Sequence, residues 1–251
     1  MTQQEFDILS KHLQSIVEDV PLKWGKIQND GYDNRFKKEG RDIFAINNYD
    51  QLLESVKDYP KELRDYYCHR WFLLQCSRCE EFLFYKNENV IPNPQTKSKS
   101  WDIRIDRRYQ IKGKSFSSTH YFDVKGARIP SNFIANNLAR GQNRDSFAKE
   151  TIKDPRGLIC HLYENQSDGV RFDMQNRLFL VHHSFVEYKR EMNLRTVWVT
   201  KMAAAKTFVE KINDIVLYSY KGCTTGLIFI LENQKDSYEY IIPGLNPNCY
   251  F

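Results

Sequence analysis

The stretch WDIRIDRRYQIKGKSFSSTHYFDVKGARIP, residues 101–130, decides the fold of this chain because both of its ends read as strands. Residues 101–105 and 121–130 consist mostly of side chains that favour a buried sheet. Asp102 nevertheless stands in the first run, and Asp123 and Lys125 stand in the second. A valine or isoleucine would be cheaper to bury at each of these positions. Charges kept in such strands indicate a chemical use.

Side chains alternate across a strand, so Tyr121, Asp123 and Lys125 share one face while Phe122 and Val124 share the other. If residues 101–105 pair with this strand as a hairpin, the carboxyl groups of Asp102 and Asp123 come close together. Two adjacent carboxylates repel, and one takes up a proton unless a cation neutralises the pair. Mg²⁺, or Mn²⁺ in its place, is the natural cation because carboxylate oxygens are its preferred ligands. A metal-bound water beside Lys125 could then attack a phosphate.

A breaker-free run from residue 61 to 86 predicts a long helix with apolar residues on most faces. Glu80 and Glu81 lie near its end and point in different directions, since successive helical residues differ by about 100°. Either glutamate could complete an acidic cluster with the two aspartates. The sequence does not decide which one does, and either could instead be an ordinary solvent-facing charge.

The basic charge of the chain is concentrated around the same strands. The net charge is +5, but residues 97–128 hold nine basic and three acidic side chains, a local balance of +6. A basic segment attracts polyphosphates such as nucleic acid, although a solvated charged hairpin has the same composition. The residues expected to contact a nucleic-acid backbone are Arg107, Arg108, Lys112, Lys114 and Arg128, with Gln142 and Arg144 further along the chain.

The remaining patterns predict a mixed architecture. We expect a helix over residues 1–20, a basic excursion at 106–120, and a mixture of loop and short helix at 131–157. Strands are expected at 158–165 and 176–184, a helix at 201–213, and a hairpin over 225–244. Strands and helices mix without strict alternation, which predicts an α/β or α+β fold with a central mixed sheet flanked by helices. Residues 1–50 are expected to form an N-terminal helical extension and residues 51–251 a single domain.

Composition excludes several other classes of protein. The longest apolar runs fall far short of the roughly 20 residues that span a bilayer, and the polar N-terminus lacks the apolar segment of a secretory signal. Six cysteines without a disulfide spacing favour reduced thiols in a cytoplasmic protein. The chain also lacks the glycine-rich loops that bind nucleotides and the common hydrolase and metalloprotease motifs.

The order of helix with Glu, strand with Asp, and strand with Asp-x-Lys resembles the PD-(D/E)xK nuclease superfamily, to which many restriction endonucleases belong. The resemblance covers roughly residues 60–130. It implies a restriction-endonuclease-like core and Mg²⁺-dependent hydrolysis of nucleic-acid phosphodiesters. Trp101 stands where the first motif of the family has proline, and the Gln-x-x-x-Tyr of its exonuclease-like branches is missing downstream. The sub-family is therefore left open.

Carried over by position, Asp102 matches the first acid of the motif, Asp123 the second acid and Lys125 the lysine, while Glu80 or Glu81 matches the acid of the preceding helix. The resemblance implies a DNA endonuclease of a restriction, defence or repair system, with RNA not excluded as substrate and a homodimer as one possible assembly. Metal ligands would be Asp102, Asp123 and Glu81. Two alternatives stay open: a catalytically inactive relative that binds nucleic acid, and a structural or interaction protein in which Asp-x-Lys is a surface salt bridge.

Overall fold

The computed structural model describes the chain except for residues 23–31, 33–37, 40–41, 95–99, 166–174 and 246–251. The chain divides into two compact units, Met1–Cys79 and Glu80–Phe251. The long helix α4, Lys61–Tyr85, begins in the first unit and ends in the second. The expected separation at residue 50 stays a prediction.

The first unit is helical. It contains α1 (Gln3–Ile16), the short 3₁₀ helix η1 (Ile43–Ala45), α3 (Tyr49–Val56) and most of α4. A capping box starts α1, because the Thr2 hydroxyl accepts from the Glu5 amide while the Glu5 carboxylate accepts from the Thr2 amide. Trp71 of α4 is fully buried and its indole N–H donates to the carbonyl of Ile46. The expected helices at 1–20 and 61–86 are therefore confirmed.

The second unit is built on a mixed sheet with the strand order β1-β2-β3-β4-β6-β5, and β7 also pairs with β6. Strands β1 to β3 are antiparallel, whereas β3, β4 and β6 are parallel to one another. The strands are β1 (Val90–Pro92), β2 (Ile103–Ile111), β3 (Lys114–Arg128), β4 (Arg177–Ser184), β5 (Tyr218–Tyr220), β6 (Cys223–Gln234) and β7 (Ser237–Ile241). The structure therefore confirms the expected α/β class, a mixed sheet flanked by helices.

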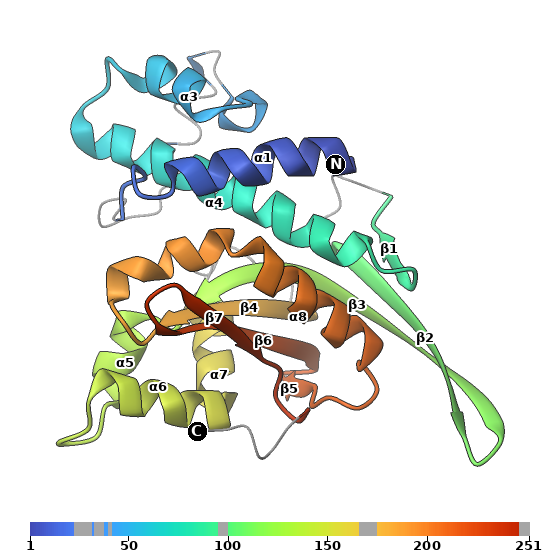
Figure 1. Ribbon diagram of the computed structural model, residues 1–251. Coiled ribbons are helices and arrows are strands. Elements are labelled where there is room, and N and C mark those ends of the chain that lie inside the picture. The colour runs from blue at the N-terminus through green and yellow to red at the C-terminus, as the bar shows by residue number, and fades with distance from the viewer. Residues whose placement is uncertain (23–31, 33–37, 40–41, 95–99, 166–174, 246–251) are drawn as a thin grey trace. The chain divides into compact units, whose positions relative to one another are not determined.

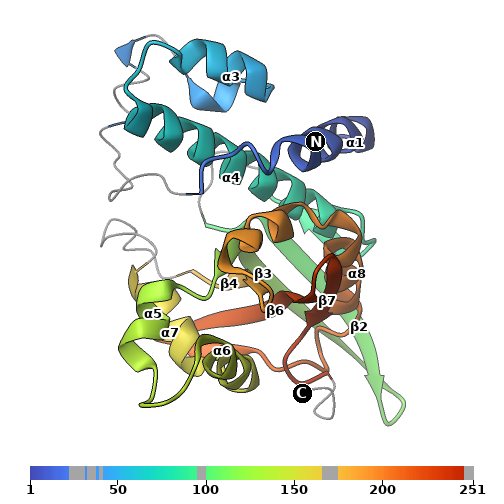
Figure 2. The same cartoon turned by 60° about the vertical axis from the view of Figure 1, so that its left-hand side comes forward.

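Helices cover both faces of the parallel strands. On one face α5 (Ser131–Asn137), α6 (Arg144–Lys153) and α7 (Arg156–Asn165) pack in one apolar cluster with alternate residues of β4 and β6, among them Phe179 and Leu227. On the other face lies α8 (Trp198–Glu210), whose Phe208 sits directly over Gly226. Figure 2 shows α5, α6 and α7 grouped together, apart from α8. The short helices η2 (Tyr188–Glu191) and η3 (Asn193–Thr196) connect β4 to α8.

Two predictions were wrong in this unit. Residues 158–165 form most of helix α7, not a strand. Residues 106–120 are not an excursion, because β2 and β3 continue through them as one long two-stranded ribbon, which Figure 1 shows projecting from the sheet. Lys112 and Gly113 both have positive φ angles, 47° and 76°, which makes the tight turn at the tip.

Candidate functional site

The candidate site lies where β3 changes its partner. Phe122 is the last residue of β3 that pairs with β2, and Asp123 is the first that pairs with the parallel strand β4. The amide of Asp102 still donates to the carbonyl of Phe122, at 2.8 Å, so the register places Asp102 opposite Asp123. The predicted hairpin pairing of these two segments is confirmed, and it brings the two aspartates together.

The fork in the sheet also fixes the carboxylate of Asp102. Because β2 begins at Ile103, the amide of Val124 has no further residue of that strand to pair with. It donates instead to Oδ2 of Asp102, at 2.8 Å. The side chain of Asp102 therefore takes the place of a β2 backbone carbonyl as the acceptor for Val124. This hydrogen bond fixes the orientation of the carboxylate.

Asp123 is almost completely buried, with 4% of its surface exposed. Its Oδ1 lies 2.6 Å from Nζ of Lys125, and its Oδ2 lies 3.9 Å from Nε of Arg177, which opens β4. Oδ2 of Asp123 and Nε of Arg177 are both buried and make no hydrogen bond. Such unsatisfied buried polar atoms are costly, and they are common where a further ligand is bound.

Glu81 joins the two aspartates electrostatically. The pKa of Glu81 is raised to about 8, first by burial and then by the negative charges of Asp102 and Asp123, against the opposing effect of Lys125. The pKa of Asp102 is raised to about 6, first by burial and then by the charge of Asp123 and a hydrogen bond with its carboxyl group. Glu81 and Asp102 thus both have raised pKa values beside the charge of Asp123, which is the condition that a bound cation relieves.

The raised pKa of Glu81 predicts a pH-dependent stability. An unfolded glutamate ionises near pH 4.3, whereas in the folded protein the pKa of Glu81 is about 8. The folded state therefore holds the proton longer, and the protein loses stability as the pH rises from about 5 to 8. We expect urea unfolding without metal to show this loss, with Glu81 contributing up to about 1.4 kcal/mol per pH unit.

The matched variants for this test are Glu81→Gln and Glu88→Gln. The first removes the titrating group and is expected to flatten the pH dependence between about pH 6 and 8, above the pKa of Asp102, while the second changes an exposed glutamate of the same unit and should leave it as in the wild type. Identical slopes in all three proteins would contradict the burial of Glu81 among the aspartates.

Glu80 belongs to a different cluster. Its Oε1 lies 2.5 Å from Nζ of Lys201, 3.6 Å from Nε2 of His182 and 3.9 Å from Nη1 of Arg195. Burial and the positive charges of Lys201 and Arg195 lower the pKa of His182, so the imidazole is neutral. The structure therefore brings Glu81 to the aspartates, and it places Glu80 in a buried ion cluster on α8 and η3.

This ion cluster lies against β3 at Gly126, the residue that follows Lys125. A Cβ atom on Gly126 would lie 1.8 Å from Nη1 of Arg195 and 2.7 Å from Oε2 of Glu80. Position 126 therefore has to be glycine for these side chains to approach the strand. Three residues of these clusters were not predicted from the sequence: Arg195, Lys201 and Arg177. Arg177 is a charged residue at the start of an apolar run, and Asp102 was recognised by a similar pattern.

The residues expected to contact nucleic acid separate into two groups. Arg107, Arg108, Lys112 and Lys114 all lie on the ribbon of β2 and β3, although Arg107 already donates to the carbonyl of Glu210 at the end of α8. The others have protein partners elsewhere: Arg128 with Tyr188, Gln142 with Glu150, and Arg144 with Glu191. Lys97 and Lys99, part of the basic segment, lie outside the described residues.

The donor set suits Mg²⁺ in its usual protein environment, which is one or two carboxylates with waters and substrate phosphate completing the shell. Asp102 and Asp123 provide such a pair, and the unsatisfied Oδ2 of Asp123 is a ready ligand atom. Within the described parts of the chain, no group of three or more His, Cys, Asp or Glu side chains is placed to hold a metal. The participation of Glu81 as a third ligand stays a prediction.

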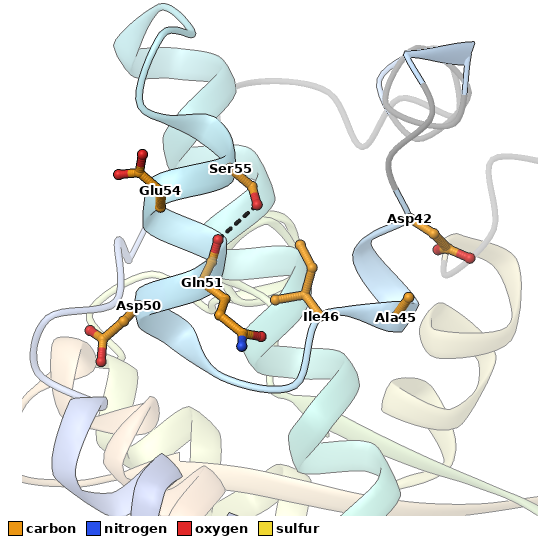
Figure 3. A pocket seen from close by; sticks show the side chains of 7 residues that line it. All are labelled: Asp42, Ala45, Ile46, Asp50, Gln51, Glu54 and Ser55. Carbon is orange, nitrogen blue, oxygen red and sulfur yellow. Dashed lines mark hydrogen bonds between the residues drawn. The ribbon is translucent and has the colours of Figure 1, made fainter.

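A hollow of about 670 Å³ lies in the first unit, between η1 and α3. Figure 3 shows Ile46 and Ala45 on one side of it and Gln51 and Ser55 of α3 on the other. Its lining also includes the acidic residues Asp42, Asp50 and Glu54, and no basic residue is among the described residues that line it. This charge does not suit the polyanionic substrate that the sequence predicts.

Comparison with known proteins adds no assignment, since no family model, no curated protein and no solved structure matches this chain. Among the described residues, no helix is both long enough and apolar enough to cross a membrane.

Proposed function

We propose that this chain is a metal-dependent nuclease that hydrolyses phosphodiester bonds of DNA. The observation that carries the proposal is the meeting of Asp102 and Asp123 at the fork of the sheet, with the Lys125 ammonium 2.6 Å from Asp123. A buried and a partly buried carboxyl group beside an amine supply the groups that metal-assisted phosphodiester hydrolysis requires.

The order of elements supports a restriction-endonuclease-like core of the PD-(D/E)xK type. The end of α4 carries Glu81, β2 follows Asp102, and β3 carries Asp123 and Lys125. Helices α5 to α7 then lead to β4, which is parallel to β3. This order of elements supports the resemblance, and all the matching residues lie in one unit.

Each residue has a defined role in the proposed reaction. Asp102 and Asp123 would hold Mg²⁺ or Mn²⁺, which when bound neutralises charge on the phosphate and lowers the pKa of a coordinated water. Lys125, partly exposed while Asp123 is buried, can donate to the attacking water or to the phosphate oxygens. Arg177, whose Nε lies 3.9 Å from Oδ2 of Asp123 without a hydrogen bond, adds positive charge near the site.

The non-catalytic alternative also has an observation in its favour. With its pKa near 8, Glu81 is largely protonated at neutral pH, and Oδ1 of Asp123 is taken by Lys125. A protein with this site could bind nucleic acid through its ribbon without cutting it. The surface salt bridge is less well supported, because the carboxylate of Asp123 is buried.

Plasmid cleavage by the wild-type protein tests the proposal. Supercoiled DNA incubated with Mg²⁺ or Mn²⁺ is expected to be nicked or linearised, and EDTA should abolish the reaction. A parallel RNA substrate separates the two nucleic acids, and sedimentation with DNA tests for the homodimer that cutting both strands would favour. Binding without cleavage in any metal would favour the non-catalytic module, and neither binding nor cleavage at low salt would refute both.

A further inference from the structure

The ribbon formed by β2 and β3 has two chemically different faces. One face holds Arg104, Asp106, Arg108 and Gln110 of β2, paired respectively with Tyr121, Thr119, Ser117 and Ser115 of β3. The other face holds Ile103, Ile105, Arg107 and Tyr109, paired respectively with Phe122, His120, Ser118 and Phe116. We call these the open face and the packed face.

The packed face is fixed to α8 and the turn after it. Phe122 contacts Phe208 with ring centroids 6.0 Å apart, and Arg107 donates to the carbonyl of Glu210 at 2.7 Å. Further out, the hydroxyl of Ser118 donates to Asn213 at 2.8 Å. These contacts hold the base of the ribbon against the helix. We therefore consider the opposite face as the candidate binding surface.

The open face leads directly into the candidate site. Side chains two residues apart on a strand share a face, so the row Ser115, Ser117, Thr119 and Tyr121 continues into Asp123 and Lys125. At about 3.4 Å per residue the row from Ser115 to Asp123 is roughly 27 Å long. That is the length of several nucleotides. Its hydroxyl groups and the exposed Arg108 suit phosphate and sugar without reading sequence.

An aromatic side chain stands on this face immediately before the acids. Tyr121 is 40% exposed, and it is steadied by Trp101, with ring centroids 5.2 Å apart and an interplanar angle of 71°. Unpaired bases stack on exposed aromatic rings that lie next to groups suited to bind phosphate. Bases inside a duplex already stack on their neighbours and do not offer this surface.

We propose that the open face is the path of single-stranded DNA, with a base that flanks the scissile phosphate stacked on Tyr121. This rests on the proposed nuclease function and adds the form of the substrate. The strand would run from the tip of the ribbon past Arg108 and Ser117 to Tyr121, and its next phosphate would then reach Asp102 and Asp123.

The test is DNA binding in EDTA, so that it does not depend on catalysis. A labelled single strand of about 20 nucleotides and the duplex of the same sequence are titrated by fluorescence anisotropy with wild type, Tyr121→Ala, Tyr121→Phe and Phe116→Ala. Phe116 is the matched control, because it is an aromatic residue of the same strand, 43% exposed, on the packed face. Thermal unfolding confirms that each variant is folded.

Tyr121→Ala is expected to weaken single-strand binding by about 5- to 150-fold, the range for loss of one stacked base. Tyr121→Phe should keep the wild-type affinity, and Phe116→Ala should stay within about twofold. Wild-type affinity in Tyr121→Ala, an equal loss in Phe116→Ala, or an equal loss for the duplex would each overturn the proposed path. If the wild type still cuts plasmid with Mg²⁺ in such a case, the nuclease function stands and the path alone is wrong.

Discussion

Asp123→Asn is expected to lower the rate of Mg²⁺-dependent DNA cleavage by about 10²- to 10³-fold or more, the usual cost of removing one group that stabilises charge in the transition state. The substitution keeps the shape of the side chain but removes one of the two negative charges that would hold the cation. It also removes the partner of Lys125, now 2.6 Å away, so the ammonium loses its fixed position. Single-turnover cleavage with saturating protein measures the change in the chemical step.

The matched control for this variant is Asp154→Asn. Asp154 lies between α6 and α7, outside the open face, and its exposed carboxylate pairs with Arg156 at 2.5 Å. Removing a charge there should change the cleavage rate by less than a few-fold, since surface ion pairs contribute little. Similar rates for Asp123→Asn and wild type, with both proteins folded, would remove Asp123 from the catalytic site.

Lys125→Ala separates the two roles that the geometry allows for the lysine. If the ammonium acts on the attacking water or on the phosphate, this variant should lose about 10²- to 10³-fold in rate while keeping most of its DNA affinity. If Lys125 only neutralises Asp123, the variant should bind metal more tightly and keep most of its activity. Cleavage rates measured across a series of Mg²⁺ concentrations distinguish the two results.

The sequence predicted the meeting of the aspartates for a sound reason. Alternation along a strand puts Asp123 and Lys125 on one face whatever the rest of the fold does, and a hairpin with Asp102 needed only a plausible turn. The sequence did not reveal that β3 exchanges partners between Phe122 and Asp123. That exchange depends on β4, which lies more than 50 residues further along the chain, and such pairings are not encoded in any local pattern.

The two errors in secondary structure have local causes. Residues 158–165 contain buried positions at Leu158, Ile159, Leu162 and Tyr163, a helical spacing, but a short apolar run also fits a strand. The ribbon was missed because its open face is polar throughout, and polar runs resemble loops. The pair Lys112 and Gly113 was the available signal, because a glycine in a two-residue turn indicates a hairpin.

The choice between Glu80 and Glu81 was beyond the sequence for a different reason. Both lie at the end of one helix, and their directions on the helical wheel were known. Their partners were not known, because Glu80 forms ion pairs with Arg195 and Lys201, which lie over 110 residues further along the chain. Only the placement of α8 shows that the buried charge at position 80 is already neutralised.

Glu80→Ala is therefore expected to destabilise the second unit strongly, by about 3–5 kcal/mol, the usual effect of breaking a buried ion pair. Glu80 and Lys201 are 1% and 0% exposed, and their charged atoms are 2.5 Å apart. Removing the carboxylate leaves the Lys201 ammonium and the Arg195 guanidinium buried beside a neutral imidazole. Urea unfolding measures the loss, and Glu62→Ala, at an exposed position of the same helix, should change it by less than about 0.5 kcal/mol.

The double variant Glu80→Ala with Lys201→Met shows whether the charge itself causes the loss. Removing both partners leaves no unpaired ion, so the double variant should be more stable than Glu80→Ala alone, and the cycle should give a coupling energy well above that of a surface pair. A loss below about 1 kcal/mol in Glu80→Ala would mean that solvent reaches Lys201. The ion cluster would then not be the element that holds Arg195 and Glu80 against Gly126.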